Sequence, residues 1–405
     1  MRNLNHCRQD FPSLSREHNG RPFVYLDGPA GSQIPQSVID AISDYYKTCN
    51  ANTHGQFLTT HETDVVMARA RNRMADFLGA EGQETISFGH NMTTLCFSLS
   101  RAIGRTLKAG DEVLITELDH EANRGPWSSL KELGVTIKEV EMLPTGVLDY
   151  EDFASKVTDR TQLIAIGYAS NLTGTINDVK KARELADQVG AMVIVDAVHY
   201  APHYPIDVQD ISCDFLLCSA YKFYGPHIGI LYSKPGLLDT LPTDRLSTQE
   251  QVAPYKIETG TLNHAAIAGV SAALDYIESF GEGASPRKRI KDAMNKISYH
   301  EHALGKRLYD GLNTIPGVEV KGLDFSDFNR TPTISFYKEG ITAEEVCKKL
   351  GEHSICGWDG HFYAEKAVEK FGLLEKGGLT RLGASIYTTA DEIDYAVEVI
   401  KNIVE

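Results

Sequence analysis

The chain has 405 residues, 42% of them hydrophobic, which is enough for one large core or two domains of ordinary size. Its formal net charge of -15 argues against a nucleic-acid or acidic-lipid surface, because such surfaces need clustered Lys and Arg. No run approaches the ~20 apolar residues of a membrane span, and residues 1–12 lack the apolar centre of a signal peptide. We therefore expect a soluble, cytoplasmic protein with no nucleic-acid or membrane partner.

The cysteines indicate a reducing compartment. The chain has seven, with no C-x-x-C and no paired framework, at positions 7, 49, 96, 213, 218, 347 and 356. Cys218 ends an apolar run, where cysteine behaves as a small core residue.

Amphipathic stretches alternate with short apolar runs over the first part of the chain. Helices are predicted at 38–46, 65–78 and 178–189, because their apolar residues share one helical face. Strands are predicted at 84–88, 112–116, 135–140, 163–168, 192–196, 215–218 and 228–232. Most of these runs are continuously apolar, as expected for a parallel sheet with helices on both faces. The pattern predicts an open α/β sheet that binds ligands at the carboxyl ends of its strands.

After about residue 264 the pattern changes. Long helices are predicted at 265–280 and 289–312, followed by mixed strands and helices to the end of the chain. We predict an N-terminal segment (1–20) that packs on the small domain, a large domain (21–265), linking helices (266–310) and a smaller α+β C-terminal domain (311–405).

Two residues in the predicted sheet point to cofactor chemistry. Asp196 closes an apolar strand, and a carboxylate buried there is costly unless it meets a cation, such as a protonated pyridine nitrogen. Lys222 follows the predicted strand 215–218, and burial beside a cofactor would lower its pKa enough for imine formation at neutral pH. Spacing alone leaves a solvent-exposed lysine as an equal alternative.

Other motifs carry a family resemblance. In chain order they are Y-L-D-G-P-A at 25–30, N-A-N-T-H at 50–54, G-H-N-M-T-T at 89–94, G-D-E at 110–112, L-D-H-E-A-N at 118–123, S-N-L-T-G at 170–174, V-D-A-V-H at 195–199 and E-T-G-T-L-N at 258–263. Together they resemble the class V aminotransferase superfamily of pyridoxal-phosphate (PLP) enzymes, and its cysteine-desulfurase branch. The resemblance covers nearly the whole chain. It implies the fold type I PLP-dependent transferase architecture, with a mostly parallel seven-stranded sheet.

The resemblance also implies roles for the matching residues. Lys222 would hold PLP as a Schiff base, Asp196 would pair with the ring nitrogen, and His120 would stack on the ring; without the family context, His120 reads as a cap of a turn. Asn171 and His199 would also contact the cofactor. The phosphate ligands would be Met92, Thr93, Ser219, Tyr221 and, from the neighbouring subunit, Thr261. A helix start after a strand is a suitable anion site, which agrees with a phosphate beside Met92 and Thr93. A contact from Thr261 of the neighbouring subunit implies a homodimer with shared active sites.

A substrate site is implied as well. Arg381, in L-T-R-L-G at 379–383, resembles the family arginine that binds the substrate carboxylate through two hydrogen bonds, which predicts an α-amino acid substrate. His54, Asn171 and Tyr363 are expected to contact the substrate. Phe57 and Trp358 would make the side-chain pocket aromatic and uncharged, which favours a neutral, aromatic or thioether side chain.

One segment departs from the cysteine desulfurases. The related enzymes carry R-x-G-x-x-C on a mobile loop, whereas this chain reads W-D-G-H-F-Y at 358–363, so Tyr363 stands at the cysteine position. A phenol with an ordinary pKa of ~10 cannot accept sulfur as a thiolate does. Cys356 is the remaining candidate thiol, although it reads as the end of a short strand.

No metal site is expected. His199 and His203 have a suitable spacing, but Pro202 and Pro205 would break the helix that aligns them.

The leading hypothesis is a PLP-dependent, cysteine-desulfurase-like C–S lyase that acts by β-elimination. Lys222, displaced by the substrate amine, would remove the Cα proton; sulfur would leave from Cβ, and an aminoacrylate would hydrolyse to ammonia and a keto acid. An aminotransferase or an amino-acid epimerase of the same superfamily is the alternative. A non-catalytic scaffold is disfavoured, because Asp196, Lys222 and Arg381 occur together.

Overall fold

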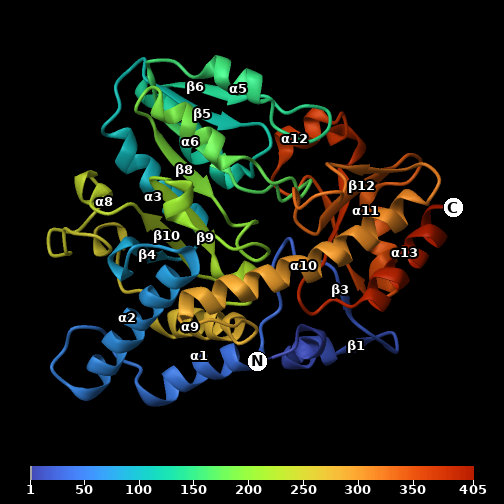
Figure 1. Ribbon diagram of the computed structural model, residues 1–405, viewed down its shortest axis with the longest axis horizontal. Coiled ribbons are helices and arrows are strands. Elements are labelled where there is room, and N and C mark those ends of the chain that lie inside the picture. The colour runs from blue at the N-terminus through green and yellow to red at the C-terminus, as the bar shows by residue number, and fades with distance from the viewer. Residues whose placement is uncertain (1) are drawn as a thin grey trace.

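The computed structural model describes residues 2–405 and contains a large seven-stranded sheet (Figure 1). The order is β4-β10-β9-β8-β7-β5-β6, and β10 runs antiparallel to both of its neighbours while the remaining pairs are parallel. The strands are β4 (Ile86–Gly89), β5 (Glu112–Thr116), β6 (Thr136–Val140), β7 (Thr161–Gly167), β8 (Met192–Asp196), β9 (Phe215–Ser219) and β10 (Gly229–Ser233). The predicted mostly parallel seven-stranded α/β sheet is confirmed, and every strand lies within two residues of its predicted bounds.

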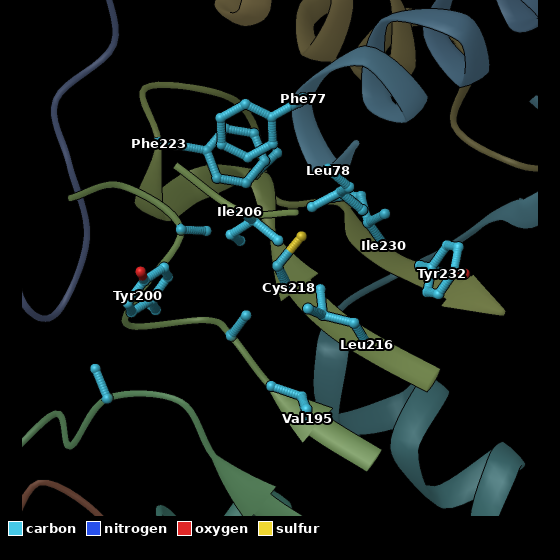
Figure 2. Close-up of a cluster of buried hydrophobic side chains, with 14 of the residues drawn as sticks. Phe77, Leu78, Val195, Tyr200, Ile206, Leu216, Cys218, Phe223, Ile230 and Tyr232 are labelled. Carbon is cyan, nitrogen blue, oxygen red and sulfur yellow. The ribbon is translucent and has the colours of Figure 1, made fainter. Parts of the chain in front are cut away.

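The central strands are continuously apolar because their side chains enter two different cores. On β9, Leu216 and Cys218 lie in one hydrophobic cluster, whereas Phe215 and Leu217 lie in the other. Figure 2 shows the first cluster, in which the Phe77 ring lies against the Phe223 ring, 4.9 Å away between centroids. Each large side chain buried in this way contributes about 1.5–3 kcal/mol.

Helices cover both faces of the sheet. The longer ones are α1 (Gln36–Thr48), α2 (Leu58–Leu78), α3 (Met92–Gly104), α6 (Val179–Asp187), α9 (His264–Glu278) and α10 (Pro286–Asn313). The shorter ones are α4 (Gly125–Ser128), α5 (Tyr150–Lys156), α7 (Val208–Ile211) and α8 (Leu237–Thr240). Within residues 2–405, none of the helices combines the length and apolar character needed to cross a membrane.

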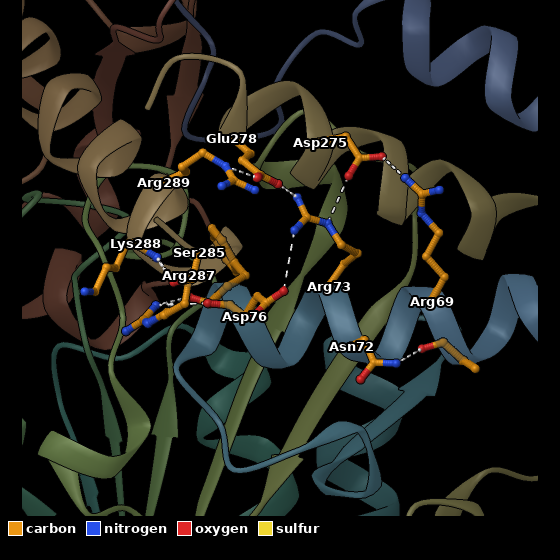
Figure 3. Close-up of polar contacts among 12 residues, drawn as sticks. Arg69, Asn72, Arg73, Asp76, Asp275, Glu278, Ser285, Arg287, Lys288 and Arg289 are labelled. Carbon is orange, nitrogen blue, oxygen red and sulfur yellow. Dashed lines mark hydrogen bonds and ion pairs between the residues drawn. The ribbon is translucent and has the colours of Figure 1, made fainter. Parts of the chain in front are cut away.

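Ion pairs join α2, α9 and α10 (Figure 3). Arg73 of α2 contacts Asp275 at 2.9 Å and also Glu278, both on α9, and Arg289 of α10 reaches Glu278 at 2.5 Å. Because the Arg73 side chain is only 10% exposed, this group of charges is screened less than a surface pair would be.

The C-terminal part of the chain forms a smaller antiparallel sheet with its own core. Its order is β11-β12-β15-β14, with β11 (Val318–Lys321), β12 (Thr333–Lys338), β15 (Leu379–Gly383) and β14 (Trp358–Gly360). The helices are α11 (Ala343–Glu352), α12 (Glu365–Lys370) and α13 (Ala390–Val404). Helix α10 packs against α9 and α2 at one end and against α13 at the other, so it lies between the two sheets (Figure 1).

The N-terminal strands and the segment before them lie against this smaller part and against the large one. A hairpin of β1 (Glu17–His18) and β2 (Arg21–Pro22) precedes β3 (Val24–Tyr25), which pairs with β13 (Ile355–Cys356). Arg8 forms an ion pair with Glu392 at 2.9 Å, and the Phe11 ring contacts Tyr276 of α9. Residue 1 lies outside the described residues, and the division into independent domains stays a prediction.

Candidate active site

A cavity of about 350 Å³ opens at the carboxyl ends of β5, β7, β8 and β9. Asp196 ends β8, Ser219 ends β9, and Arg381 enters from β15 of the smaller sheet. The cavity brings together the predicted site residues Met92, Thr93, His120, Asn171, Asp196, His199, Ser219, Tyr221, Lys222, Tyr363 and Arg381.

Lys222 is a buried amine. It follows β9 in a short 3₁₀ turn, is 8% exposed, and its Nζ donates a hydrogen bond to the Pro29 carbonyl. Burial, helped by the positive charge of Arg381, lowers the pKa of Lys222 to about 7. A neutral amine, which can act as nucleophile and base, is therefore well populated near neutral pH.

Asp196 is a buried carboxylate without a close cation. It accepts a hydrogen bond from the Val198 backbone at 2.9 Å, and burial raises its pKa to about 7. Asp119 contributes a second buried negative charge, and its own pKa is raised to about 6 by burial. A protonated pyridine nitrogen would compensate for this burial. Asp119 was not among the predicted site residues, although it directly precedes His120.

His120 both caps a turn and lines the cavity. Its Nδ1 accepts a hydrogen bond from the Ala122 backbone at 3.0 Å, and burial lowers the pKa of His120 to about 4. The ring is therefore neutral, with its proton on Nε2. It lies 5.4 Å from the Tyr363 ring, centroid to centroid.

The start of α3 forms one end of the cavity. Asn91 caps this helix by accepting from the Thr94 backbone at 2.9 Å, and the Met92 backbone donates to the Ser219 hydroxyl at 3.3 Å. Gly229 permits this approach, since a Cβ there would lie 2.3 Å from the Asn91 carbonyl carbon. Partial positive charge at a helix start, with Thr93 and Ser219 beside it, suits a phosphate.

Three residues that line the cavity carry a buried polar atom with no hydrogen-bond partner among residues 2–405. The atoms are Asn171 Oδ1, His199 Nδ1 and Arg381 Nε. The other ring nitrogen of His199 lies 2.9 Å from the Thr333 hydroxyl, and burial lowers the pKa of His199 well below its usual value. Leaving such atoms unpaired costs free energy, so they are groups that a polar ligand would satisfy. Together with Lys222, Asp196 and the start of α3, they fit PLP.

Arg381 is a buried residue that lines the cavity. Its Nη1 donates to the Asn171 carbonyl at 3.0 Å, and the Phe362 ring centroid lies 4.3 Å from the guanidinium carbon. Burial lowers the pKa of Arg381 to about 10, so the group stays positively charged at neutral pH. A fixed guanidinium in this position can bind a substrate carboxylate.

The mouth of the cavity is aromatic. Trp358 and Tyr363 are 54% and 66% exposed, whereas Phe362 is buried and its ring lies against Arg381. Phe362 and Tyr363 both have positive φ angles, 53° and 58°, which non-glycine residues adopt only when neighbouring structure holds them. One such contact runs from the Glu121 backbone to the Tyr363 carbonyl at 2.7 Å.

His54 and Thr261 do not reach this cavity within one chain. They line a second cavity of about 950 Å³, together with the buried, bidentate ion pair between Arg71 and Glu258. Phe57, predicted near the substrate, is 58% exposed and lines neither cavity.

No cysteine of residues 2–405 lines the first cavity. Cys356 pairs with Tyr25 through the β13 backbone, and burial raises the pKa of its thiol. Burial also raises the pKa of Cys347, to about 12. In the same part of the chain no group of three or more His, Cys, Asp or Glu side chains could hold a metal ion, and His203 contacts Glu301 at 2.6 Å.

Comparison with known proteins identifies the family. The sequence profile described as aminotransferase class-V matches residues 24–396. The chain belongs to the aminotransferase class-V family. Members of this family depend on PLP, and this chain is a PLP-dependent enzyme.

Two of its relatives and one solved structure match over nearly their whole length. A probable cysteine desulfurase of Synechocystis sp. is 33% identical over 96% of this chain and 92% of its own. A cysteine desulfurase of Pectobacterium atrosepticum is 31% identical over 99% of this chain and 98% of its own. The apo structure of a cysteine desulfurase from Thermococcus onnurineus NA1 superposes with a TM-score of 0.89 at 28% identity, covering 100% of this chain and 98% of that chain.

Proposed function

We propose that this aminotransferase class-V enzyme is a C–S lyase that cleaves a β-substituted α-amino acid by elimination. The observation that carries the proposal is the composition of one cavity: it holds Lys222, Asp196 and Arg381, but none of the cysteines within residues 2–405 lines it. The relatives described as cysteine desulfurases support cysteine or a cysteine derivative as the substrate.

Each residue has a definite part in this proposal. Arg381 binds the α-carboxylate and so orients the amino acid over the catalytic groups. Lys222 removes the Cα proton, because its buried amine is neutral near pH 7. PLP, when bound, supplies an electron-withdrawing ring that stabilises negative charge at Cα. Met92, Thr93, Ser219 and Tyr221 hold its phosphate, Asp196 its ring nitrogen, and His120, Asn171 and His199 its ring and substituents.

The absence of a cysteine among the described residues that line the cavity supports elimination over sulfur transfer to the protein. Transfer of sulfur to a protein thiol would leave alanine, whereas elimination releases the sulfur leaving group and leaves a product that hydrolyses to pyruvate and ammonia. Tyr363 contacts the substrate at the mouth but cannot accept sulfur, since its phenol has no thiolate character.

The enzyme test is a substrate screen. Purified protein incubated with cysteine, cystine or an S-alkyl cysteine is expected to release pyruvate and ammonia in equal amounts, and Lys222→Ala is expected to release neither. No pyruvate from any of the three would refute the lyase proposal. Conversion of the cofactor to its amine form would indicate an aminotransferase, and deuterium exchange at Cα with loss of chirality would indicate an epimerase.

The proposal also includes a cytoplasmic homodimer, in which each active site contains residues of both subunits. The support is the second cavity, where His54 and Thr261 lie apart from Lys222 of the same chain. Exposed apolar side chains occur on the neighbouring segments: Phe57, Leu58, Leu246 and Val252. In the proposed dimer, Thr261 contacts the phosphate in the partner's site and His54 lies near the partner's substrate.

Mixing two inactive variants tests the shared site. Lys222→Ala and Thr261→Ala chains, unfolded together and refolded, are expected to regain activity, since a mixed dimer has one site with both residues intact. Light scattering gives the oligomeric state. Recovery no greater than in either variant refolded alone would contradict shared sites.

A further inference from the structure

Asp27 lies beside Arg381, although the two residues are far apart in the sequence. The chain continues from β3 through Leu26 to Asp27, alongside the end of β15, where the Gly383 backbone donates to the Leu26 carbonyl at 2.7 Å. Asp27 and Gly383 form an isolated parallel bridge. This arrangement places Asp27 Oδ1 3.7 Å from Arg381 Nη2.

The contact between Asp27 and Arg381 is electrostatic. At 3.7 Å it is longer than a hydrogen bond, and Asp27 Oδ1 is buried with no hydrogen-bond partner among residues 2–405. The Arg381 side chain is only 4% exposed and the Asp27 side chain only 11%, so little water screens their charges. Asp27 does not line the cavity itself, and it therefore acts on a ligand through Arg381.

The same turn also contacts Lys222. The Pro29 carbonyl accepts the hydrogen bond from Lys222 Nζ, two residues after Asp27. The groups that face the Asp27 carboxylate electrostatically are Arg381, Lys222, Tyr25, Cys347 and Cys356. Burial raises the pKa of Asp27 to about 6, while Arg381 and Lys222 act to lower it.

We propose that Asp27 is an internal competitor for Arg381, a positioning residue whose negative charge weakens the binding of carboxylate ligands at that guanidinium. This inference rests on the proposed role of Arg381 in binding the substrate carboxylate. Without a ligand, Asp27 compensates the buried positive charge of Arg381. With a ligand, two carboxylates share one guanidinium and repel each other, so substrate and keto-acid product are bound less tightly and leave faster.

A second consequence is coupling to protons. A bound carboxylate raises the pKa of Asp27 above its value of about 6, so the complex holds more protons than the free enzyme. Carboxylate affinity is therefore expected to increase as the pH falls toward 6, and the Asp27 contribution to this dependence disappears when the carboxyl group is removed.

Propionate is a suitable probe, because it has a carboxylate but no amine that could react with the cofactor. Its dissociation constant is measured by calorimetry on the PLP-loaded enzyme at pH 7.5. Asp27→Asn is expected to bind propionate at least ~5-fold more tightly than wild type, from the removal of one repulsive charge pair. Asp44→Asn, an exposed residue of α1 with the same charge change, is the matched control and should stay within ~2-fold.

Proton uptake on propionate binding, measured in two buffers with different ionisation enthalpies, is the second measurement. Wild type should take up protons, and Asp27→Asn should take up fewer. The proposal would be overturned if Asp27→Asn bound propionate with unchanged or weaker affinity, or if both proteins took up equal numbers of protons. Asp27→Ser removes the same charge and replaces the first variant if that variant does not fold. Arg381→Gln distinguishes failure of the Asp27 proposal from failure of the proposed role of Arg381. If this variant still binds propionate, the role of Arg381 in carboxylate binding is refuted instead.

Discussion

The floor and the mouth of the cavity are built differently. The floor consists of buried residues at the ends of sheet strands, such as Asp196 and Lys222, whose neighbours fix their positions and shift their pKa values. The mouth consists of exposed aromatic residues of the C-terminal part, such as Trp358 at the start of β14 and Tyr363 in the loop that follows it. In the proposed function, cofactor binding and Cα deprotonation depend on the floor, whereas the fate of the leaving group depends on the mouth.

In the proposed function, this difference explains how the chain can share a family with cysteine desulfurases and still cleave its substrate by elimination. Its floor carries the residues that resemble the family motifs, while the sequence comparison of motifs predicts Tyr363 at the position of the desulfurase cysteine. Substitutions in the floor should therefore abolish every reaction of the enzyme, and substitutions in the mouth should change rates and substrates only slightly.

The largest effect is expected for Lys222→Ala. Loss of both the cofactor attachment and the base should reduce kcat by ~10⁴-fold or more. Visible absorption of the bound cofactor and steady-state kinetics measure the two losses separately. A variant that keeps more than a few per cent of the activity would show that another group removes the Cα proton.

Asp196→Asn should alter the pH dependence of stability in the cofactor-free protein. Burial raises the folded-state pKa of Asp196 to about 7, so the wild type binds a proton on folding between pH 4 and pH 7. Its stability relative to the variant should fall as pH rises through this range, by at most ~4 kcal/mol. Urea unfolding of both proteins at several pH values measures this difference, and a constant difference would contradict the assignment.

Arg381→Lys should act mainly on KM. Replacing a guanidinium by an ammonium removes one of two charge-assisted hydrogen bonds to the carboxylate, which should raise KM about 10- to 100-fold. Steady-state kinetics separate this from kcat, which should change less. An unchanged KM would mean that the substrate carboxylate binds elsewhere.

Tyr363→Phe tests the mouth. It removes one hydroxyl from an exposed ring, and we expect kcat/KM to change by at most ~5-fold, the value of one hydrogen bond. A loss of 100-fold would instead make the phenol a catalytic group.

Cys356→Ala should have the smallest effect, since its partly buried thiol belongs to a strand pair and lies outside the cavity. Pyruvate release is expected to stay within ~2-fold of wild type. Abolished activity in a folded variant would restore a role for this thiol.

The floor could be predicted from the sequence because it depends on local signals. Continuous apolar runs predicted the seven strands within two residues, and Asp196 and Lys222 stand next to such runs. The role of His120 could be predicted only in part, because the sequence is compatible with either a cap of a turn or a cavity residue. In the fold His120 is both, since the turn that it caps lies at the carboxyl end of β5.

The remaining contacts depend on distant parts of the chain. Asp27 meets Arg381 only because β3 joins β13 and then runs beside β15. Phe362 and Tyr363 have positive φ angles without a glycine signal in the sequence, and their carbonyls accept hydrogen bonds from the distant residues Asn171 and Glu121. Neither could be predicted from residue type or spacing.

The products formed from L-cysteine test the central claim most directly. The PLP-loaded enzyme is incubated with L-cysteine, with and without a small-molecule thiol, and pyruvate, ammonia and alanine are quantified together. Elimination without a protein thiol predicts pyruvate and ammonia in equal amounts and no alanine. Alanine as the main product, formed in step with a persulfide on the protein, would contradict it.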